Sequence, residues 1–222
     1  MADLIVKNAC VVTMNPKRVI YKNGAIAIDG NNISGVGPTT EILDTHEAAQ
    51  IIDASGMLAT PGLIDAHQHP AQYLSNGVGD DVDLTTWLYD RVYPYETTLT
   101  SEEAYTGALG AYAESIKYGT TCFNDPGGHN ADSSARAAID IGIRGIIGRS
   151  TQDHNDPVFH APPALIEDTE SCLANCEAHV SRWHGEAAGR DGARLARRLC
   201  AAVEVGAAAV AQRGEELRRD AR

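Results

Sequence analysis

The sequence predicts an α/β protein in which a small β module precedes a parallel sheet covered by helices. Up to about residue 58 it reads as short β-strands broken by turn residues, and from residue 59 onward strands alternate with helices. Such alternation is typical of strand–helix–strand units, whose strands pair in parallel. At the junction a Pro-Gly turn leads into the apolar pair Leu63 and Ile64, which marks the first parallel strand.

Composition and charge narrow the classes of function. A chain of 222 residues with 43% hydrophobic residues is long enough for one globular domain or somewhat more. The formal net charge of −12 argues against binding to nucleic acid or to an anionic membrane, because both need a basic surface. Neither a long apolar stretch nor a signal peptide is visible, and the five cysteines show no disulfide pattern. We therefore expect a cytoplasmic protein.

Residues 1–58 are predicted to form the β module. Its clearest turn signal is Asp29-Gly30-Asn31-Asn32, in which Gly and Asn suit the positive φ of a hairpin turn. A short helix is expected between residues 39 and 50. The predicted strands are Leu4–Val6, Cys10–Thr13, Ala25–Asp29, Ile33–Val36 and Ile51–Asp53.

The helix expected over residues 102–118 has the strongest local signals after residue 59. Thr100 and Glu103 form a T-x-x-E capping box at its start, and Gly119 follows its end. Apolar residues recur along it at helical spacing and give one face that can lie on a sheet. The other predicted elements are strands 120–125 and 143–148 and helices 133–141 and 164–183, after which no fourth strand is expected.

Two histidines at the end of the first parallel strand are the strongest candidates for chemistry. Side chains at i and i+2 of an extended segment point to the same face, so His67 and His69 can present ring nitrogens to one metal ion. An H-x-H pair also occurs in surface loops that bind nothing. The residues around the pair decide between these interpretations.

The flanking residues give this segment a family pattern. Residues 61–69, Pro-Gly-Leu-Ile-Asp-Ala-His-Gln-His, match the pattern P-G-[LF]-[IV]-[DN]-x-H-x-H throughout. The segment resembles the first barrel strand of the metal-dependent amidohydrolase superfamily. Downstream, residues 80–84 (Asp-Asp-Val-Asp-Leu) and 86–88 (Thr-Trp-Leu) resemble the branch that contains cytosine and guanine deaminases, adenosyl-type deaminases and triazine hydrolases.

This resemblance implies an incomplete TIM-type (β/α) barrel of about three strands, preceded by a small N-terminal β-sandwich module. Residues 1–58 would form the module and residues 59–184 the first part of the barrel. A complete barrel of this type needs roughly 250 residues, so we do not expect one in this chain. The implied activity is metal-dependent hydrolysis of carbon–nitrogen bonds other than peptide bonds, such as deamination of a heterocycle, by water that a divalent zinc or iron ion activates.

The resemblance also assigns roles to individual residues. His67 and His69 become metal ligands, and Gln72 and Trp87 become candidates to contact a small-molecule substrate. Trp87 could equally belong to a helix face packed on the barrel. Later strands of the family supply two further histidines and an aspartate; we assign none of them in this sequence, so the catalytic residue stays unknown.

Other side chains of metal-binding type have simpler interpretations. Those near the expected catalytic face are Asp125, His129, His154 and His160. We expect these to be loop or pocket-lining residues rather than ligands. Cys172, Cys176 and His179 share one helix face at a spacing that could hold zinc. Because no second pair of ligands accompanies them, we interpret this face as a partly buried one in which cysteine acts as a small apolar residue.

Residues 185–222 differ in composition from the rest of the chain. They contain eleven alanines and eight arginines among 38 residues, and no lysine. One interpretation is an Ala-rich helix, because Ala, Arg, Leu and Glu all favour helices. The other is the product of a reading frame that shifts near Gly185 in a GC-rich gene. The change falls where a fourth strand is due, which favours the frame shift.

Three functional hypotheses follow. The chain is an amidohydrolase-type enzyme; or it is an inactive fragment that does not retain its metal ion, since two ligands bind weakly; or it is a half that a separate C-terminal polypeptide completes. A homo-oligomer is compatible with each of them.

Overall fold

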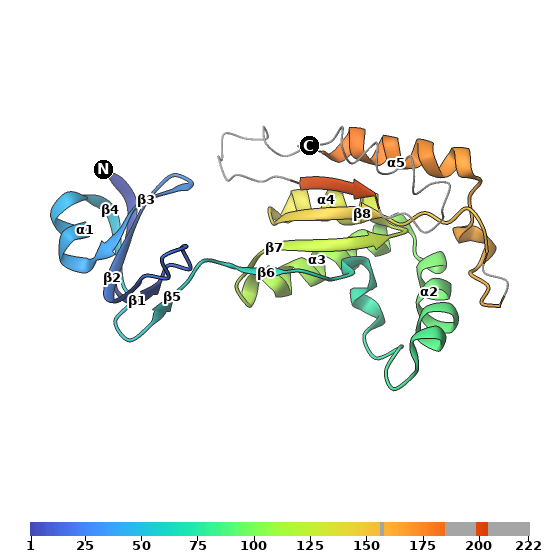
Figure 1. Cartoon of the computed structure of the whole chain (residues 1–222), viewed down its shortest axis with the longest axis horizontal. Helices are drawn as coiled ribbons and strands as arrows, with labels where there is room; N and C mark the ends of the chain where they lie inside the picture. The colour runs from blue at the N-terminus through green and yellow to red at the C-terminus, as the bar shows by residue number, and fades with distance from the viewer. Residues whose placement is uncertain (156–157, 185–198, 204–222) are drawn as a thin grey trace. The chain divides into compact units, whose positions relative to one another are not determined.

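The computed structural model describes residues 1–155, 158–184 and 199–203, which fall into two compact units (Figure 1). One unit comprises residues 1–62, and the other begins at Leu63. The elements of the first unit are β1 (Ala2–Val12), β2 (Ile20–Asp29), β3 (Asn32–Pro38), α1 (Thr39–Thr45), β4 (Ala48–Asp53) and β5 (Leu58–Ala59). The strands and α-helices of the second are β6 (Leu63–Asp65), α2 (Tyr93–Thr98), α3 (Ser101–Lys117), β7 (Thr120–Gly128), α4 (Ala131–Ile141), β8 (Arg144–Arg149), α5 (Thr169–Trp183) and β9 (Leu199–Val203).

The first unit is a single sheet in the order β3-β2-β1-β4, with β5 also pairing with β1. The two strands predicted over Leu4–Val6 and Cys10–Thr13 are one continuous β1, whose register shifts at Asn8, a residue with φ 63°. Ile5, Ala25 and Ala27 are buried with Ile42 of α1 on one side of the sheet.

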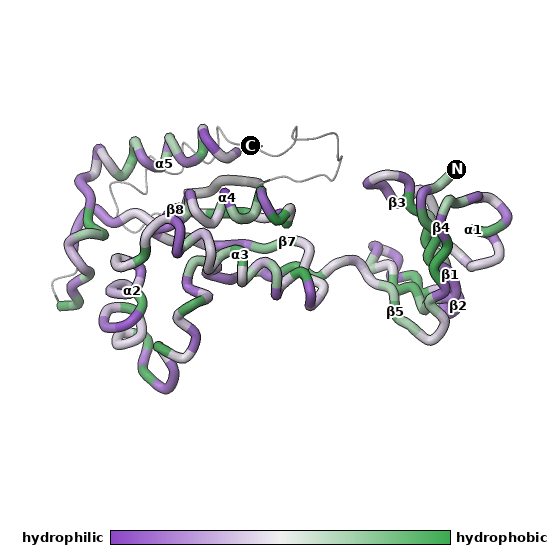
Figure 2. The backbone as a smooth tube through the Cα atoms, turned by 180° about the vertical axis from the view of Figure 1, so that it is seen from behind, coloured by the Kyte–Doolittle hydropathy of each residue, from purple (hydrophilic) through white to green (hydrophobic). Residues whose placement is uncertain are grey.

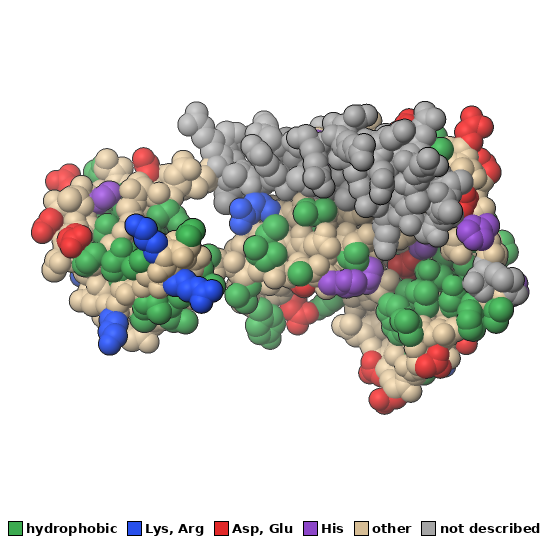
Figure 3. Space-filling model, viewed as in Figure 1, with side chains coloured by type: hydrophobic (Ala, Val, Ile, Leu, Met, Phe, Trp, Pro, Cys, Tyr) green, Lys and Arg blue, Asp and Glu red, His purple; other side chains and the backbone are tan. Residues whose placement is uncertain are grey.

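The expected sandwich is only half present in the described part of this unit. Large apolar side chains stay exposed there, and they include Ile33, Ile51, Ile52, Met57 and Leu58. Figure 2 shows hydrophobic residues along the strands of the first unit, and Figure 3 shows hydrophobic side chains at its surface. The residues described here therefore form one layer, and the second layer of a sandwich is not among them.

The second unit is a parallel sheet in the order β6-β7-β8-β9. Helices α3 and α4 lie side by side against it, α3 on β7 and α4 on β8 (Figure 1). In the core between the helices and the sheet, the helices contribute mostly alanines, and the strands contribute the larger side chains of Phe123 and Ile147. Its members are Ala108, Tyr112, Phe123, Ala131, Ala135, Ala137, Ala138, Ile143 and Ile147.

Strand β9 corrects the expectation of three parallel strands. Leu199–Val203 pairs in parallel with β8, although the composition of the tail predicted no strand there. Alanines and a cysteine have weak strand preferences of their own, so pairing with β8 determines this strand rather than local propensity. The rest of the predicted tail, residues 185–198 and 204–222, lies outside the described residues, and the frame-shift interpretation stays a prediction.

The long helices begin where their caps predict. Thr100 and Glu103 form the reciprocal capping box of α3, with Thr100 N donating to Glu103 Oε2 at 2.8 Å and Glu103 N donating to Thr100 Oγ1 at 3.2 Å. Helix α5 begins at Thr169 and not near residue 164. The reason is Asp168, whose carboxylate accepts from Ser171 N at 2.9 Å and caps the helix.

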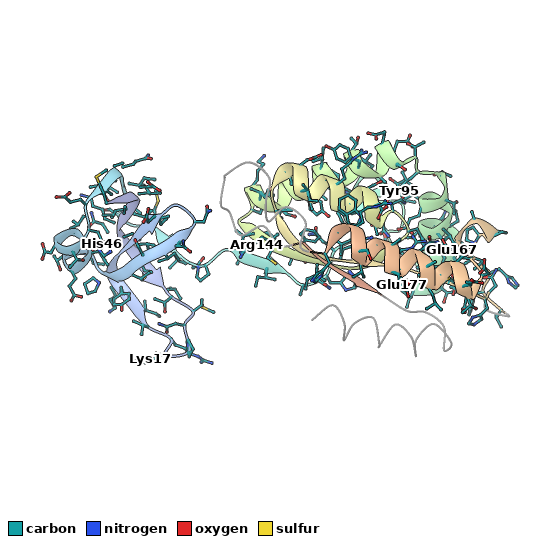
Figure 4. All side chains as sticks on the ribbon, turned by 90° about the horizontal axis from the view of Figure 1, so that it is seen from above. Lys17, His46, Tyr95, Arg144, Glu167 and Glu177 are labelled. Carbon is teal, nitrogen blue, oxygen red and sulfur yellow. The ribbon has the colours of Figure 1, made fainter. Side chains whose placement is uncertain are left out.

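Three short helical segments lie at the carboxyl end of the sheet, and the sequence did not predict them separately. They are a 3₁₀-helix (Pro70–Ser75), a π-helix (Thr86–Val92) and α2, which continues the π-helix. Figure 4 shows the two ends of the unit: Arg144 at the start of β8 lies far from Tyr95 of α2 and from Glu167. Among the described helices, none is long and apolar enough to cross a membrane.

Candidate functional site

The H-x-H segment follows directly on β6 and is held against β7. The side chain of Asn124 donates to Ala66 O at 3.1 Å, and the backbone carbonyl of Asn124 accepts from Gln68 N at 3.0 Å. His67 N also donates to Asp65 Oδ1 at 3.2 Å. These bonds fix the backbone on both sides of His67 and up to the residue before His69.

The two imidazoles lie close together at this strand end. The ring centroids of His67 and His69 are 5.1 Å apart, with the ring planes at 85°. Because a zinc–nitrogen bond is about 2.1 Å long, this separation leaves room for one ion between two ring nitrogens. His67 is exposed and His69 is partly buried.

Asp125 of β7 contacts His69. Its side chain is 3% exposed, and its Oδ1 lies 3.5 Å from Nδ1 of His69. That distance is at the outer limit for a hydrogen bond, and Nδ1 is a buried atom with no well-formed hydrogen bond among the described residues. Asp125 raises the pKa of His69, while burial of the ring opposes the rise. The geometry therefore shows a short-range contact that has not closed to a standard hydrogen bond.

A cavity of about 470 Å³ opens beside His69. Both residues predicted to contact substrate, Gln72 and Trp87, line it. It is also lined by Glu96, His129 and His154 and by an aromatic and apolar wall. That wall consists of Leu88, Tyr89, Val92 and Tyr93.

Glu96 is a buried acid in this cavity that the sequence did not single out. Its side chain is 5% exposed; Oε1 accepts from Gln72 Nε2 at 2.9 Å, and Oε2 lies 3.8 Å from His129 Nε2. Burial raises the pKa of Glu96, against the hydrogen bond from Gln72. Burial also lowers the pKa of His129 to about 4, and the charge of Arg149 adds to this effect. At neutral pH the imidazole of His129, which lies beside the buried Glu96, is therefore uncharged.

A second cavity of about 450 Å³ lies on the other side of His69 and includes His67. His69, Gln72, Trp87 and Val92 line both cavities, so they form the wall between them. The ring of Trp87 sits so close to Gly79 that a side chain at residue 79 would collide with it. That Gln72 and Trp87 contact substrate remains a prediction; both residues line the two cavities.

The π-helix positions the aromatic wall. This rare helix type is frequent at functional sites, and here it carries Trp87 and Tyr89 into the first cavity. Tyr89 stacks on Phe159 at a centroid distance of 5.6 Å, and Tyr93 meets the ring of His129 edge to face at 5.8 Å. No periodic signal in the sequence distinguishes such a segment from an α-helix.

The other histidines and cysteines noted in the sequence differ in whether they line a cavity. His129 and His154 line the first cavity, whereas His160 is exposed and lines none of the cavities described here. Cys172 and Cys176 are fully buried on α5, as their interpretation as a buried helix face predicted. Burial raises the pKa of Cys172 to about 11, so this thiol is a poor metal ligand.

The described residues fit a metal ion only in part. His67 and His69 offer two nitrogen donors, and His69 has a buried nitrogen in need of a fixed partner. Within the described part of the chain, no group of three or more His, Cys, Asp or Glu side chains could hold an ion. The site thus supplies two donors and an adjoining cavity.

Comparison with known proteins identifies the family of this fold and site. The sequence model of the amidohydrolase family matches residues 58–208, which is more than half of the chain and includes β9. The chain belongs to the amidohydrolase family. This confirms the resemblance of the H-x-H segment.

Two relatives found by sequence comparison are deaminases. A 5-methylthioadenosine/S-adenosylhomocysteine deaminase of Desulforudis audaxviator is 38% identical over 192 residues, which cover 86% of this chain and 41% of the relative. A 5'-deoxyadenosine deaminase of Methanosarcina acetivorans is 35% identical over 190 residues, with the same coverage of 86% and 41%. The chain therefore spans about two fifths of the length of these curated relatives.

Solved structures confirm the predicted fold class, a partial TIM-type barrel. An adenosine deaminase from Xanthomonas campestris with bound zinc has a TM-score of 0.79 at 23% identity, covering 99% of this chain and 47% of that chain. A guanine deaminase from E. coli has a TM-score of 0.77 at 21% identity, covering 97% and 51%. At these identities the likeness concerns the fold.

Proposed function

We propose that this amidohydrolase-family chain carries the first part of a metal-dependent deaminase that removes the exocyclic amine of an adenine nucleoside. The observation that supports it most directly is the placing of His67 and His69 at the carboxyl end of a parallel sheet, beside a cavity that holds a buried carboxylate. The deaminases of adenine nucleosides among the relatives support the class of substrate.

The chain's own residues would bind and orient this substrate. When bound, a divalent zinc or iron ion would supply an activated water to attack the carbon that bears the amine. His67 and His69 would hold the ion through neutral ring nitrogens. Glu96 would accept hydrogen bonds from substrate hydroxyl or amino groups, with Gln72 fixing the orientation of its carboxylate. Trp87 would provide a flat apolar surface for a planar ring.

We further propose that the isolated chain binds metal weakly and does not turn over substrate. Two imidazoles are fewer than the three protein ligands usual for catalytic zinc. The test is to load the purified chain with zinc or ferrous iron, measure bound metal by elemental analysis, and follow 5'-deoxyadenosine by ultraviolet absorbance. Stoichiometric, tightly held metal together with ammonia release would contradict this part of the proposal.

The substrate assignment has its own test. Binding of 5'-deoxyadenosine to the chain should change the fluorescence of Trp87, and Glu96→Gln should weaken binding by about tenfold because one charged hydrogen-bond acceptor is lost. The matched control Glu102→Gln alters a surface carboxylate outside the cavities and should leave binding unchanged. Equal binding by both variants would rule out Glu96 as a recognition group.

A second possibility is that a separate polypeptide completes the site. Among the described strands β6 pairs with β7 alone, and its apolar residues Leu63 and Ile64 are 59% and 72% exposed. An unpaired strand edge with apolar side chains is a template for pairing with another chain. Co-purification with the unmatched C-terminal segment of the Desulforudis audaxviator deaminase, with recovery of deaminase activity, is the expected result. A homo-oligomer by light scattering, without capture of that segment, would contradict it.

A further inference from the structure

Two consecutive residues of β7 contact the H-x-H segment from one side. We infer that Asp125 is the positioning residue of His69: its carboxylate holds the ring in the tautomer with the proton on Nδ1, while Asn124 fixes the backbone on which the ring stands. The inference rests on the proposed function in taking His69 as a metal ligand. The positional claim about the ring can be tested without any metal.

The Asp125 carboxylate and Nδ1 of His69 are both buried. Asp125 is 3% exposed, and Nδ1 of His69 is a buried nitrogen without a well-formed hydrogen bond among the described residues. Leaving a buried polar atom unpaired destabilises the fold, and leaving a buried carboxylate unpaired destabilises it more. The 3.5 Å contact between them offers each a charged or polar partner, so closing it relieves both costs.

Asp125 is itself held in place by a hydrogen bond. Its Oδ1 accepts from Gly127 N at 3.2 Å, which ties the carboxylate to the turn after β7. One residue earlier, Asn124 bonds Ala66 and Gln68 through its side chain and its backbone. The ring and the acceptor therefore belong to two segments with fixed relative positions.

The chemical consequence concerns the other ring nitrogen. A neutral imidazole with its proton on Nδ1 has its lone pair on Nε2, which is then the nitrogen able to bind a metal ion. Hydrogen bonding from Nδ1–H to a carboxylate also raises the basicity of the ligand, and losing such a partner typically lowers metal affinity 10- to 100-fold. Asp125 would thus set both the direction and the strength of the ligand.

The test is nitrogen-15 NMR of the histidine rings in the metal-free chain, at a pH high enough that the nitrogen-15 shifts of His69 report a neutral ring. The His69 signals are assigned by their loss in His69→Gln. We expect the Nδ1–H tautomer in the wild type and a shift toward Nε2–H in Asp125→Leu, which keeps the branching of the side chain but removes the acceptor. An Nε2–H ring in the wild type, or an unchanged tautomer in a folded Asp125→Leu or Asp125→Ala variant, would overturn the inference.

A zinc titration supplies the second readout. Asp125→Leu should lower zinc affinity by about 10- to 100-fold. The matched control is Asp132→Asn, a change in the contact between His179 and Asp132, and it should leave zinc affinity within about twofold. Equal effects of the two substitutions on affinity would contradict a specific role for Asp125. If the wild type binds no zinc at all, the proposed function fails, while the tautomer measurement still decides the role of Asp125.

Discussion

Two histidine–carboxylate pairs in the second unit differ in how completely they are hydrogen-bonded. On the α5 side, His179 is buried with Nδ1 3.1 Å from Asp132 and Nε2 3.3 Å from Ile147 O. Asp132 also accepts from Arg182 and Trp183. At the sheet end, His69 approaches Asp125 only to 3.5 Å and lies beside two cavities.

The difference separates a pair whose hydrogen bonds are complete from a pair that we propose serves a ligand. Around His179 both ring nitrogens have partners, so the group ties α5 to β8 and to the start of α4. Around His69 a polar group is left without a good partner, which natural proteins tolerate mainly where function requires it. Three substitutions test this contrast, from the largest expected effect to the smallest.

His179→Ala should lower the free energy of unfolding by about 3 kcal/mol, because it opens a cavity, removes two hydrogen bonds and leaves Asp132 without its main partner. Zinc affinity should not change. Urea denaturation followed by circular dichroism measures the loss. A cost below about 1 kcal/mol would show that this pair is no more structural than the one at the sheet end.

Asp132→Asn should cost about 1 kcal/mol at neutral pH, after allowance for the solvent exposure of the carboxylate. His179, followed by Trp183 and Arg182, lowers the pKa of Asp132 from 3.8 to about 2. A depressed folded-state pKa stabilises the protein above the ordinary pKa and loses that contribution as pH falls through the folded value. The difference between wild type and variant should therefore shrink between pH 3.8 and about 2. A difference that grows on acidification would have the wrong sign.

Glu96→Gln should stabilise the fold slightly, by about 0.5 kcal/mol, because an amide avoids the cost of a buried charge. Burial raises the pKa of Glu96, which shows that its charge is unfavourable in the folded state. Thermal unfolding at neutral pH, compared with Glu102→Gln, measures the gain. A clear loss of stability would mean that Glu96 is a structural residue and not one kept for binding.

Local signals predicted the fold where they acted alone. The Thr100–Glu103 capping box predicted the start of α3, and the residues around Phe123 and Ile147 predicted β7 and β8. They failed where tertiary pairing decides the structure: Leu199–Val203 forms β9 on the edge of β8 despite its alanines. The π-helix was also missed, since its hydrogen-bond pattern leaves no distinct mark on the sequence.

In the candidate site, too, local sequence signals predicted some residues, and tertiary contacts determine the others. His67 and His69 could be singled out as candidate ligands because two such residues at one strand end leave an i, i+2 pattern. Glu96 was missed because it lies on the short helix α2. Its place in the cavity depends on the contact with Gln72, which is distant in the sequence. Asp125 was noted as a strand-end residue, but its contact with His69 depends on the pairing of β6 with β7, which local sequence does not encode.

The most direct test of the account is a zinc titration of the full chain followed by nitrogen-15 NMR of its eight histidine rings. We expect the ring signals of His67 and His69 to change together over one range of zinc concentration, while those of His179 stay constant. Zinc that leaves both H-x-H rings unchanged, or that perturbs His179 first, would contradict the central claim that this strand end is a metal site.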